Sequence, residues 1–373
     1  MSGWRPRVLV CGTKFGRIYL AAFRDRDFPF ELAGILALGS ARSRACAEAY
    51  GVPLFTDPAD VPAGVDIACV VIGSSVNGGR GAELARTLMA RGMHVLQEHP
   101  LHERELVACL REARQRRVYY HLNTHYVHIA PVRRFIAAAR ELFRRQRPLF
   151  IDAICSVQTA FTLWDILGEA LGGVRPWAFA DPLALPDDVI SLSETDAPFR
   201  CLAGVIAGVP ITLRVQTVMD PADPDNYVHV MHRITVGTEG GTLTLANTHG
   251  PVLWCPRAHM PADVRDTVTL DASAAASFDI PSAGPLGPPI APTYREILGA
   301  IWPQGVRRAL TQLREAIETG RDGQARDQYH IAVARLWQDA AARIGPVKIA
   351  PHNIPRVLAA EDFWPADWRD DHV

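Results

Sequence analysis

The sequence of 373 residues lacks long apolar runs, paired cysteines and an excess of charge of either sign. No run approaches the roughly 20 apolar residues of a membrane span, and the opening MSGWRPR leads into an apparent strand without a hydrophobic signal segment. The seven cysteines include no C-x-x-C pair, which is typical of reduced thiols. A net charge of −1 argues against a strong nucleic-acid binder. We therefore expect a cytoplasmic protein that binds neither membranes nor nucleic acid.

Residues 7–23 have the pattern that opens a dinucleotide-binding βαβ unit. An apolar strand leads through a glycine-bearing turn into a helix whose apolar residues recur at helical spacing. Such a turn offers backbone N–H groups to a pyrophosphate, and glycine allows close approach. The predicted cofactor-binding residues of this turn are Gly12, Thr13, Lys14, Phe15 and Gly16. Only Gly16 falls in its usual place in the glycine fingerprint, so an ordinary strand–turn–helix corner is the alternative interpretation.

The second βαβ turn bears on the choice between NADH and NADPH. An NAD enzyme needs an acidic residue about 20 residues on, for the ribose 2′-hydroxyl, and no carboxylate stands at that point. The chain instead reads GSARSR, with a serine N-cap and two arginines at the start of a helix. Because hydroxyl and guanidinium groups suit a 2′-phosphate, Ser40, Arg42, Ser43 and Arg44 predict NADPH. The alternative is a capped helix with solvated arginines.

Three more apparent strands end beside polar or aromatic residues. One strand ends just before Ser74, the next ends at Glu98 and His99, and a third leads into Tyr126. The carboxyl ends of parallel strands form the crevice in which cofactors bind. Ser74 and Glu98 are therefore predicted to line the cofactor site, and His99 and Tyr126 to point toward one place.

From about residue 149 the pattern changes to longer strands of alternating polarity, joined by turns such as 207–208 and 239–241. With 48% hydrophobic residues, the chain is long enough for two cores. We predict an α/β fold with an N-terminal Rossmann domain, residues 1–128, and a C-terminal α+β domain with an open antiparallel sheet, residues 129–373. Residues 256–292 should form a long excursion, and helices over about 293–345 are expected to pack back on the first domain.

The order of these features resembles the glucose–fructose oxidoreductase-like superfamily of NAD(P)-dependent enzymes, which usually carries Glu-Lys-Pro where this chain has Glu98-His99-Pro100. Within that superfamily the chain is similar to the thiazolinyl imine reductases of siderophore biosynthesis, from about residue 7 to 254 and again near 331–337. The resemblance rests on the motifs Gly39-Ser40-Ala41-Arg42-Ser43-Arg44, Gln97-Glu98-His99-Pro100-Leu101-His102, Asn123-Thr124-His125-Tyr126, Asp220-Pro221-Ala222-Asp223-Pro224-Asp225 and Met231-His232-Arg233.

The resemblance implies NADPH-dependent reduction of a thiazoline C=N bond to a thiazolidine. The substrate would be a siderophore intermediate bound to a carrier protein of a nonribosomal peptide synthetase, and His99 would replace a lysine that is commonly catalytic in the superfamily. By analogy, the open sheet suggests a homodimer. Two alternatives remain: a non-catalytic NADP-binding or regulatory protein of the same fold, and a sugar-type NADP dehydrogenase. The second is disfavoured because carbinol oxidation needs the missing lysine.

Reduction of an imine requires a proton donor for the nitrogen, and His99 and Tyr126 are the two candidates. A tyrosine is protonated at neutral pH, whereas a histidine donates as an imidazolium or orients a water molecule, and neither residue is favoured. Each also has a structural interpretation, as a strand-end histidine and as a packing aromatic. Asp165 is expected to be a solvated helix carboxylate, and His232 could be a core histidine.

Two further groups of residues have a simple interpretation. His121, His125 and His128 straddle a strand and a turn without a C-x-x-C or H-E-x-x-H pattern, so we expect no metal site. Six arginines crowd one helix and its end, namely Arg133, Arg134, Arg140, Arg144, Arg145 and Arg147. Such a surface would attract an acidic carrier protein, and an ordinary solvated face is the alternative.

Overall fold

The computed structural model of the protein describes residues 3–74, 76, 78–182, 186–220, 222–223, 226–320, 323–350 and 355–364. The statements below concern these residues. In the motif of residues 220–225, Pro221, Pro224 and Asp225 lie outside the described residues, as do the ends of the two predicted domains at residues 1–2 and 365–373.

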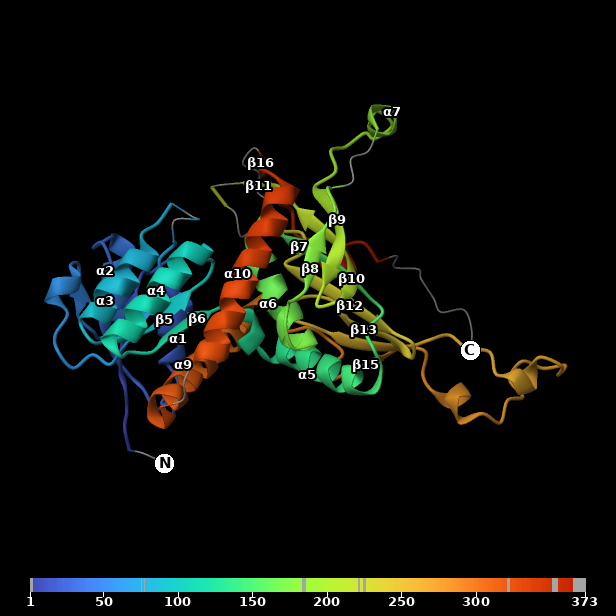
Figure 1. The fold of residues 1–373 in the computed structure, drawn as a ribbon, viewed down its shortest axis with the longest axis horizontal. Helices are drawn as coiled ribbons and strands as arrows, with labels where there is room; N and C mark the ends of the chain where they lie inside the picture. Colours follow the sequence, from blue (N-terminus) through green and yellow to red (C-terminus); the bar gives the residue numbers. More distant parts are fainter. Residues whose placement is uncertain are drawn as a thin grey trace.

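The N-terminal half is built on a parallel sheet in the strand order β3-β2-β1-β4-β5-β6 (Figure 1). The strands are β1 (Arg7–Cys11), β2 (Glu31–Leu36), β3 (Leu54–Phe55), β4 (Ile67–Val70), β5 (His94–Glu98) and β6 (Tyr120–Asn123). Neighbouring strands all pair in parallel. Strands β1 and β4 are almost wholly buried, as expected for a sheet covered by helices on both faces. The predicted Rossmann sheet is confirmed.

The helices of this half follow the strands with short connections. They are α1 (Gly16–Ala22), α2 (Ala41–Tyr50), α3 (Gly81–Ala90) and α4 (Glu103–Arg116). Helix α2 begins as the sequence predicts, because the Ser40 side chain accepts a hydrogen bond from the backbone N–H of Ser43. It ends at Gly51, whose φ of +62° is a left-handed conformation that glycine adopts without strain. The turn that begins α2 is therefore held in place by its own side chains.

The C-terminal half contains a mixed, mostly antiparallel sheet in the order β15-β14-β13-β12-β7-β10-β9-β8. Its strands are β7 (Phe150–Ser156), β8 (Trp177–Phe179), β9 (Phe199–Ile206), β10 (Val209–Gln216), β12 (His232–Thr238), β13 (Gly241–Leu245), β14 (Val252–Pro256) and β15 (Gly284–Pro285). The predicted open sheet and both predicted turns are present, at β9–β10 and β12–β13. One pair departs from the expectation, since β7 and β10 run parallel. Strands β11 (Val218–Met219) and β16 (Lys348–Ile349) form a separate parallel pair.

One face of this sheet is covered by helices α5 (Ala130–Arg145), α6 (Ala160–Leu171) and α10 (Gln324–Ile344). The other face carries the exposed residues of strands such as β10, in which Pro210, Thr212 and Arg214 alternate with buried neighbours. Residues 257–283 extend away from the body of the molecule (Figure 1) and hold only the short turns η5 (Ala262–Val264) and η6 (Ala276–Asp279). Strand β15 then returns to the edge of the sheet beside β14. The short helix α7 (Asp187–Ile190) also projects from the sheet.

The last helices connect the two halves. Helix α8 (Tyr294–Glu296) continues through a π-helical turn, η7 (Ile297–Ile301), into α9 (Trp302–Thr319). Helix α9 packs against α1, and Val306, Leu310 and Leu313 share a hydrophobic core with Tyr19 and Leu20. Helix α10 lies between the two sheets in Figure 1 and contacts both α4 and α6. None of the described helices is both long and apolar enough to cross a bilayer. The domain boundary at residue 128 stays a prediction.

Candidate active site

The turn between β1 and α1 has the close backbone approach that a nucleotide requires. Gly12 has a φ of +94°, and a Cβ at this position would lie 2.6 Å from the carbonyl oxygen of Val71. Only glycine fits such a site. Thr13 and Gly16 are buried, Lys14 is exposed, and Phe15 caps the start of α1 with a partly exposed ring. The five predicted residues therefore form one turn at the carboxyl end of β1.

At the second turn the two arginines differ. The guanidinium of Arg44 folds back and donates to the carbonyl oxygen of Gly39, whereas Arg42 is exposed and bonds to no other described residue. Ser43 is fully buried, and its hydroxyl donates to the Ser40 carbonyl oxygen at 2.8 Å. Ser40 itself is exposed. Arg42 is thus the predicted side chain that is free to reach a 2′-phosphate, and Ser43 shapes the turn.

Ser74, after β4, is almost fully buried. Its hydroxyl donates to the carbonyl oxygen of Pro100 at 2.6 Å. The next glycine-rich stretch is equally tight, since a Cβ on Gly79 would lie 2.0 Å from the carbonyl oxygen of Gly73. The hydroxyl of Ser74 consequently joins the loops that follow β4 and β5.

A buried polar network joins the ends of β5 and β6 to helix α1. The Glu98 carboxylate accepts a hydrogen bond from the Tyr19 hydroxyl and a longer one, at 3.4 Å, from the Asn123 amide. The amide of Asn123 also donates to the Tyr19 oxygen at 2.5 Å. Burial, followed by the Glu98 charge, raises the pKa of Tyr19 well above its usual range, so this hydroxyl remains a donor. The network fixes the Glu98 carboxylate.

His99 is held by the same network. Its Nδ1 lies 2.9 Å from Oε1 of Glu98 and 3.2 Å from the carbonyl oxygen of Asn123. Both neighbours are acceptors, so Nδ1 carries a proton and Nε2 is the ring nitrogen that faces away from them. The ring stacks on Phe161 of helix α6, with centroids 5.8 Å apart. Glu98, predicted to line the cofactor site, has three protein partners and orients His99.

Tyr126 lies at the centre of a cluster of rings. Its centroid is 6.5 Å from His99, 5.3 Å from His125, 5.1 Å from His232 and 6.1 Å from Trp302, all in edge-to-face arrangements. The side chain is 7% exposed. The structure thus brings the two predicted proton donors close to each other. His232 and Trp302, from later segments of the chain, complete the cluster. The catalytic roles of His99 and Tyr126 stay predictions.

The backbone at His125 is strained. Its φ of +60° and ψ of −59°, with a 2.6 Å hydrogen bond from the N–H of Tyr126 to the carbonyl oxygen of Thr124, define a rare positive-φ γ-turn. His125 is fully buried between the rings of Phe15 and Trp302. Strain of this kind is concentrated at functional sites and persists only where packing holds it. Here it sets the direction of the following residue, Tyr126.

Two histidines that contact Tyr126, and a third that contacts Trp302, are neutral. Burial lowers the pKa of His232 to about 3, and the pKa of His125 and of His249 to about 4. His232 donates through Nε2 to the carbonyl oxygen of Thr159 at 3.1 Å, and its Nδ1 accepts from Thr248 at 3.0 Å. His232 is therefore a core histidine with both ring nitrogens hydrogen-bonded, an interpretation that the sequence alone left undecided. Its ring forms one wall around Tyr126.

The expectation that Asp165 is solvated was wrong. The carboxylate is 1% exposed, accepts hydrogen bonds from Thr124 and, at 2.7 Å, from Tyr329, and burial raises its pKa. Helix α6 is buried on nearly every side, so its carboxylate does not reach solvent. Asp165 holds Thr124, which begins the γ-turn. Among the described residues, no group of three or more histidine, cysteine or acidic side chains could hold a metal ion.

Two comparisons with protein families agree with this architecture. Residues 6–124 match an oxidoreductase family with an NAD-binding Rossmann fold. Residues 146–255 match the C-terminal domain of the Irp3-like thiazolinyl imine reductases. This chain is a Rossmann-fold oxidoreductase with an Irp3-like C-terminal domain. The family resemblance of the sequence is confirmed, and dependence on NAD(P) follows at the level of the family.

Solved structures show the same fold for this Irp3-like oxidoreductase. The 3-ketoreductase KijD10 from Actinomadura kijaniata, in complex with NADP, is 15% identical, with a TM-score of 0.62 and coverage of 93% of this chain and 100% of that chain. The UDP-N-acetylglucosamine 3-dehydrogenase GnnA from Acidithiobacillus ferrooxidans is 13% identical, with a TM-score of 0.61 and coverage of 91% and 98%. No curated protein sequence matches the chain. At these identities the likeness shows the fold alone.

Proposed function

We propose that this protein uses NADPH to reduce a thiazoline C=N bond to a thiazolidine, on a siderophore intermediate tethered to a carrier protein. The carrying observation is the pair formed by His99 and Tyr126, which place two possible proton donors at adjoining strand ends, 6.5 Å apart between ring centroids. The match of residues 146–255 to the thiazolinyl imine reductases supports the substrate class.

The first two turns supply groups that fit a dinucleotide. The β1–α1 turn has no room for a Cβ at Gly12, so its backbone can approach a pyrophosphate closely. Arg42 and Arg44 are both exposed at the second turn, next to the exposed Ser40, but only Arg44 is bonded to the Gly39 carbonyl oxygen. An arginine forms charge-assisted, often bidentate hydrogen bonds with phosphate. NADPH would accordingly bind across Gly12, Lys14, Ser40 and Arg42.

The reaction adds one hydride to the imine carbon and one proton to the nitrogen. NADPH, when bound, supplies the hydride. The electron pair of the C=N π bond then resides on nitrogen, and the protein must place a donor about 2.6–3.2 Å from it. In our proposal the proton comes from the Tyr126 hydroxyl or from Nε2 of a doubly protonated His99, whose positive charge the Glu98 carboxylate balances.

The surrounding rings would keep water from this site. Phe15, Phe161 and Trp302 contact the rings of His125 and His99, and Trp302 donates to Nε2 of the neutral His249 at 3.0 Å. A dry site strengthens the electrostatic interactions of the reacting groups. It also suits an apolar heterocycle such as a thiazoline.

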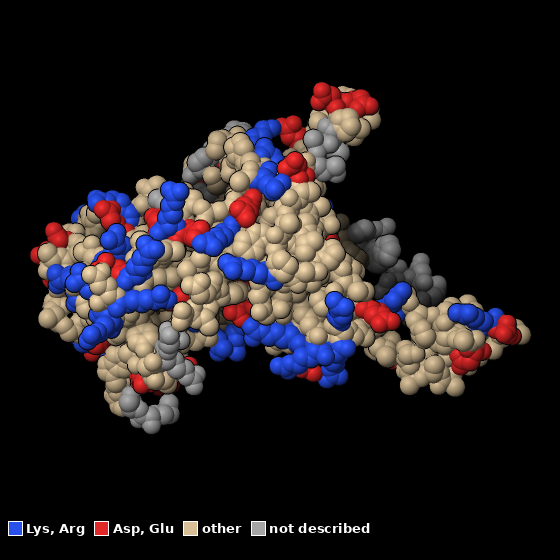
Figure 2. All heavy atoms as spheres, viewed as in Figure 1, with Lys and Arg blue, Asp and Glu red and all other residues tan. Residues whose placement is uncertain are grey.

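Two features of the assembly are part of the proposal. The carrier protein would approach the arginines of α5, which gather at the lower edge of the molecule in Figure 2. The exposed face of the C-terminal sheet, with Thr212 and Arg214, would pair with a second copy to form a homodimer. Carrier docking and dimer formation are thus proposed from the surfaces of the protein and not from the catalytic groups.

The test is consumption of NADPH with a small synthetic thiazoline, followed by mass spectrometry of the product. We expect a gain of two hydrogens in the ring and no reaction with an already reduced thiazolidine. Oxidation of a sugar nucleotide or an inositol with NADP⁺, and no thiazoline reduction, would favour the sugar-type alternative. Binding of NADPH with neither reaction would favour a non-catalytic NADP-binding protein.

A further inference from the structure

A cavity lies where helices α5, α6, α9 and α10 meet. It has a volume of 480 Å³ and is lined by helices α5, α6, α9 and α10 together with Val127 and His128, which follow Tyr126. Cavities of this size commonly hold small molecules. Its charged lining consists of four arginines, Arg133, Arg140, Arg308 and Arg326, and two carboxylates, Asp165 and Glu169. The cavity therefore has an excess of positive charge.

Both carboxylates of the cavity already have partners. Asp165 accepts hydrogen bonds from Thr124 and Tyr329. Glu169 forms an ion pair with Arg140, whose Nε also donates to the Glu169 carbonyl oxygen at 2.6 Å. Neither carboxylate bonds to Arg133 or Arg308.

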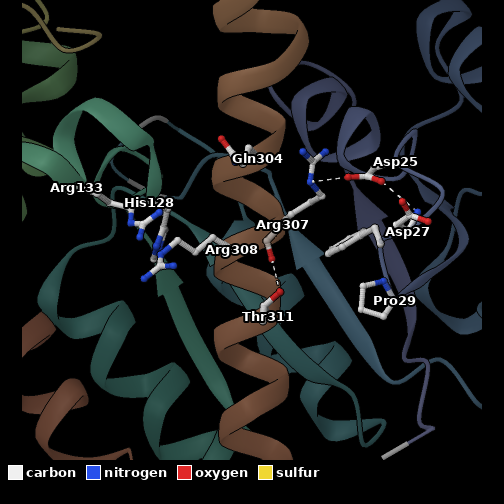
Figure 3. A pocket seen from close by; sticks show the side chains of 10 residues that line it. Asp25, Asp27, Pro29, His128, Arg133, Gln304, Arg307, Arg308 and Thr311 are labelled. Atoms are coloured by element: carbon white, nitrogen blue, oxygen red, sulfur yellow. Dashed lines mark hydrogen bonds and ion pairs between the residues drawn. The ribbon is translucent and has the colours of Figure 1, made fainter. Parts of the chain in front are cut away.

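Arg133 and Arg308 lie together at the rim. Figure 3 shows that the adjacent side chains of α9 diverge: Arg307 points to Asp25, 3.4 Å away, whereas Arg308 points toward Arg133 and His128. Within the described part of the chain, neither Arg133 nor Arg308 has a side-chain hydrogen bond or an ion pair. The same two arginines also line a neighbouring cavity of 290 Å³. Both are exposed, so a ligand can reach them.

The guanidinium groups of Arg133 and Arg308 carry like charges and repel each other. Partial burial, and then the charge of Arg308, lower the pKa of Arg133. Deeper in the cavity, Nε of Arg326 is shielded from solvent and has no hydrogen-bond partner within the described residues. His128 and His330 are buried and neutral, since burial lowers the pKa of both, that of His330 to about 3. They can donate a hydrogen bond without adding charge.

We infer that this cavity is a binding site for the phosphate group of a small molecule, held by Arg133 and Arg308 at the rim and by Arg326 within. A phosphate dianion would balance the two unpaired guanidinium groups, and its three free oxygens would accept their hydrogen bonds bidentately. The site belongs to the described helices and does not depend on the reduction proposed above.

Isothermal titration calorimetry of the full chain with inorganic phosphate, in a phosphate-free buffer and without NADPH, tests this site. We expect saturable binding that weakens roughly tenfold or more in Arg133→Gln and in Arg308→Gln, the loss of one charge-assisted bond each. Both arginines are exposed, so the variants should fold, which circular dichroism will check. Arg144→Gln, on the same helix but paired with Glu141, is the matched control and should bind as the wild type does.

The cofactor turn is the competing site for phosphate. If Arg42→Gln abolishes the binding heat while Arg133→Gln and Arg308→Gln leave it unchanged, the phosphate occupies the cofactor turn and the inference is wrong. A wild-type protein that shows no saturable binding at millimolar phosphate would also overturn it. Retention of binding in Arg42→Gln, with loss in the two rim variants, supports the site.

Discussion

Nδ1 of His99 lies 2.9 Å from Oε1 of Glu98, so a carboxylate holds the ring proton on Nδ1. In the proposed reaction Glu98 is therefore a positioning residue. In Glu98→Gln the ring loses a negative neighbour but keeps an acceptor of the same size. We expect kcat to fall about tenfold, on the order of 1.4 kcal/mol, with the KM for NADPH little changed.

The double variant Glu98→Gln with His99→Ala distinguishes positioning from a general loss of structure. If Glu98 acts only through His99, adding Glu98→Gln to His99→Ala should lower kcat no further. A rise in the KM for NADPH with kcat unchanged would contradict the role assigned to Glu98.

The proton donor itself is identified by two substitutions. Tyr126→Phe removes only a hydroxyl and His99→Ala removes the ring, and the residue that donates should lower kcat by about 10²–10⁴-fold. NADPH binding, followed by fluorescence, should survive in both. If the double variant reduces the thiazoline at nearly the wild-type rate, the proton comes from solvent and both residues only position the ring.

The sequence predicts the cofactor half of the site because the relevant signals are local. An apolar strand, a glycine and an N-cap serine lie within a few residues of one another, and the structure has the helix that Ser40 begins. The strand ends also place His99 and Tyr126 correctly, since parallel strands end at one edge. These features depend only on residues that lie near one another in the sequence and on the order of the strands.

The ring cluster could not be predicted, because its members come from distant segments. Trp302 lies 176 positions after Tyr126, and only tertiary packing brings the two rings to 6.1 Å. Tyr19 shows another limit: on a helix it reads as an apolar core residue, yet its hydroxyl donates to Glu98. A π-helical turn directly before Trp302 is the one local irregularity at that point, and π-helical turns are frequent at functional sites.

Cofactor choice is tested at the second turn. Arg42→Ala should weaken NADPH binding roughly tenfold or more, since a charge-assisted hydrogen bond contributes about 1.5–3 kcal/mol, and should leave NADH binding nearly unchanged. Arg44→Ala is the matched control, because the Arg44 guanidinium is bonded to the Gly39 carbonyl oxygen and should contribute less. Equal losses for NADPH and NADH in Arg42→Ala would remove the basis for NADPH preference.

Carrier docking is tested by reversing the charge of exposed arginines. Arg140 is unsuitable, since its ion pair with Glu169 joins α5 to α6. Arg144 pairs only within α5, with the exposed Glu141, and Arg147 is exposed beyond the end of the helix. In the double reversal Arg144→Glu and Arg147→Glu, kcat/KM for a carrier-bound thiazoline should fall about tenfold and depend less on salt. The rate with a free thiazoline should not change. A parallel loss with both substrates would mean that these arginines have only a structural role.

Buried neutral histidines make stability depend on pH. Burial lowers the pKa of His125 and His249 to about 4, and of His232 and His330 to about 3. In the unfolded chain a histidine has a pKa of about 6.5. The unfolded state therefore binds more protons below that pH, so the stabilisation is complete above pH 6.5 and is lost as the pH falls through the folded-state pKa values of about 4 and about 3.

Urea unfolding between pH 7.5 and 4.5, in phosphate-free buffer, measures this dependence. Each such histidine adds at most about 1.4 kcal/mol per pH unit to the slope of the unfolding free energy. His330→Asn should reduce the slope by up to that amount. The control is His259→Asn, in the exposed excursion, which should leave the slope as it is. If His330→Asn leaves the slope of the wild-type protein unchanged, His330 is not held neutral in the folded protein, and its assigned place in the buried core is wrong.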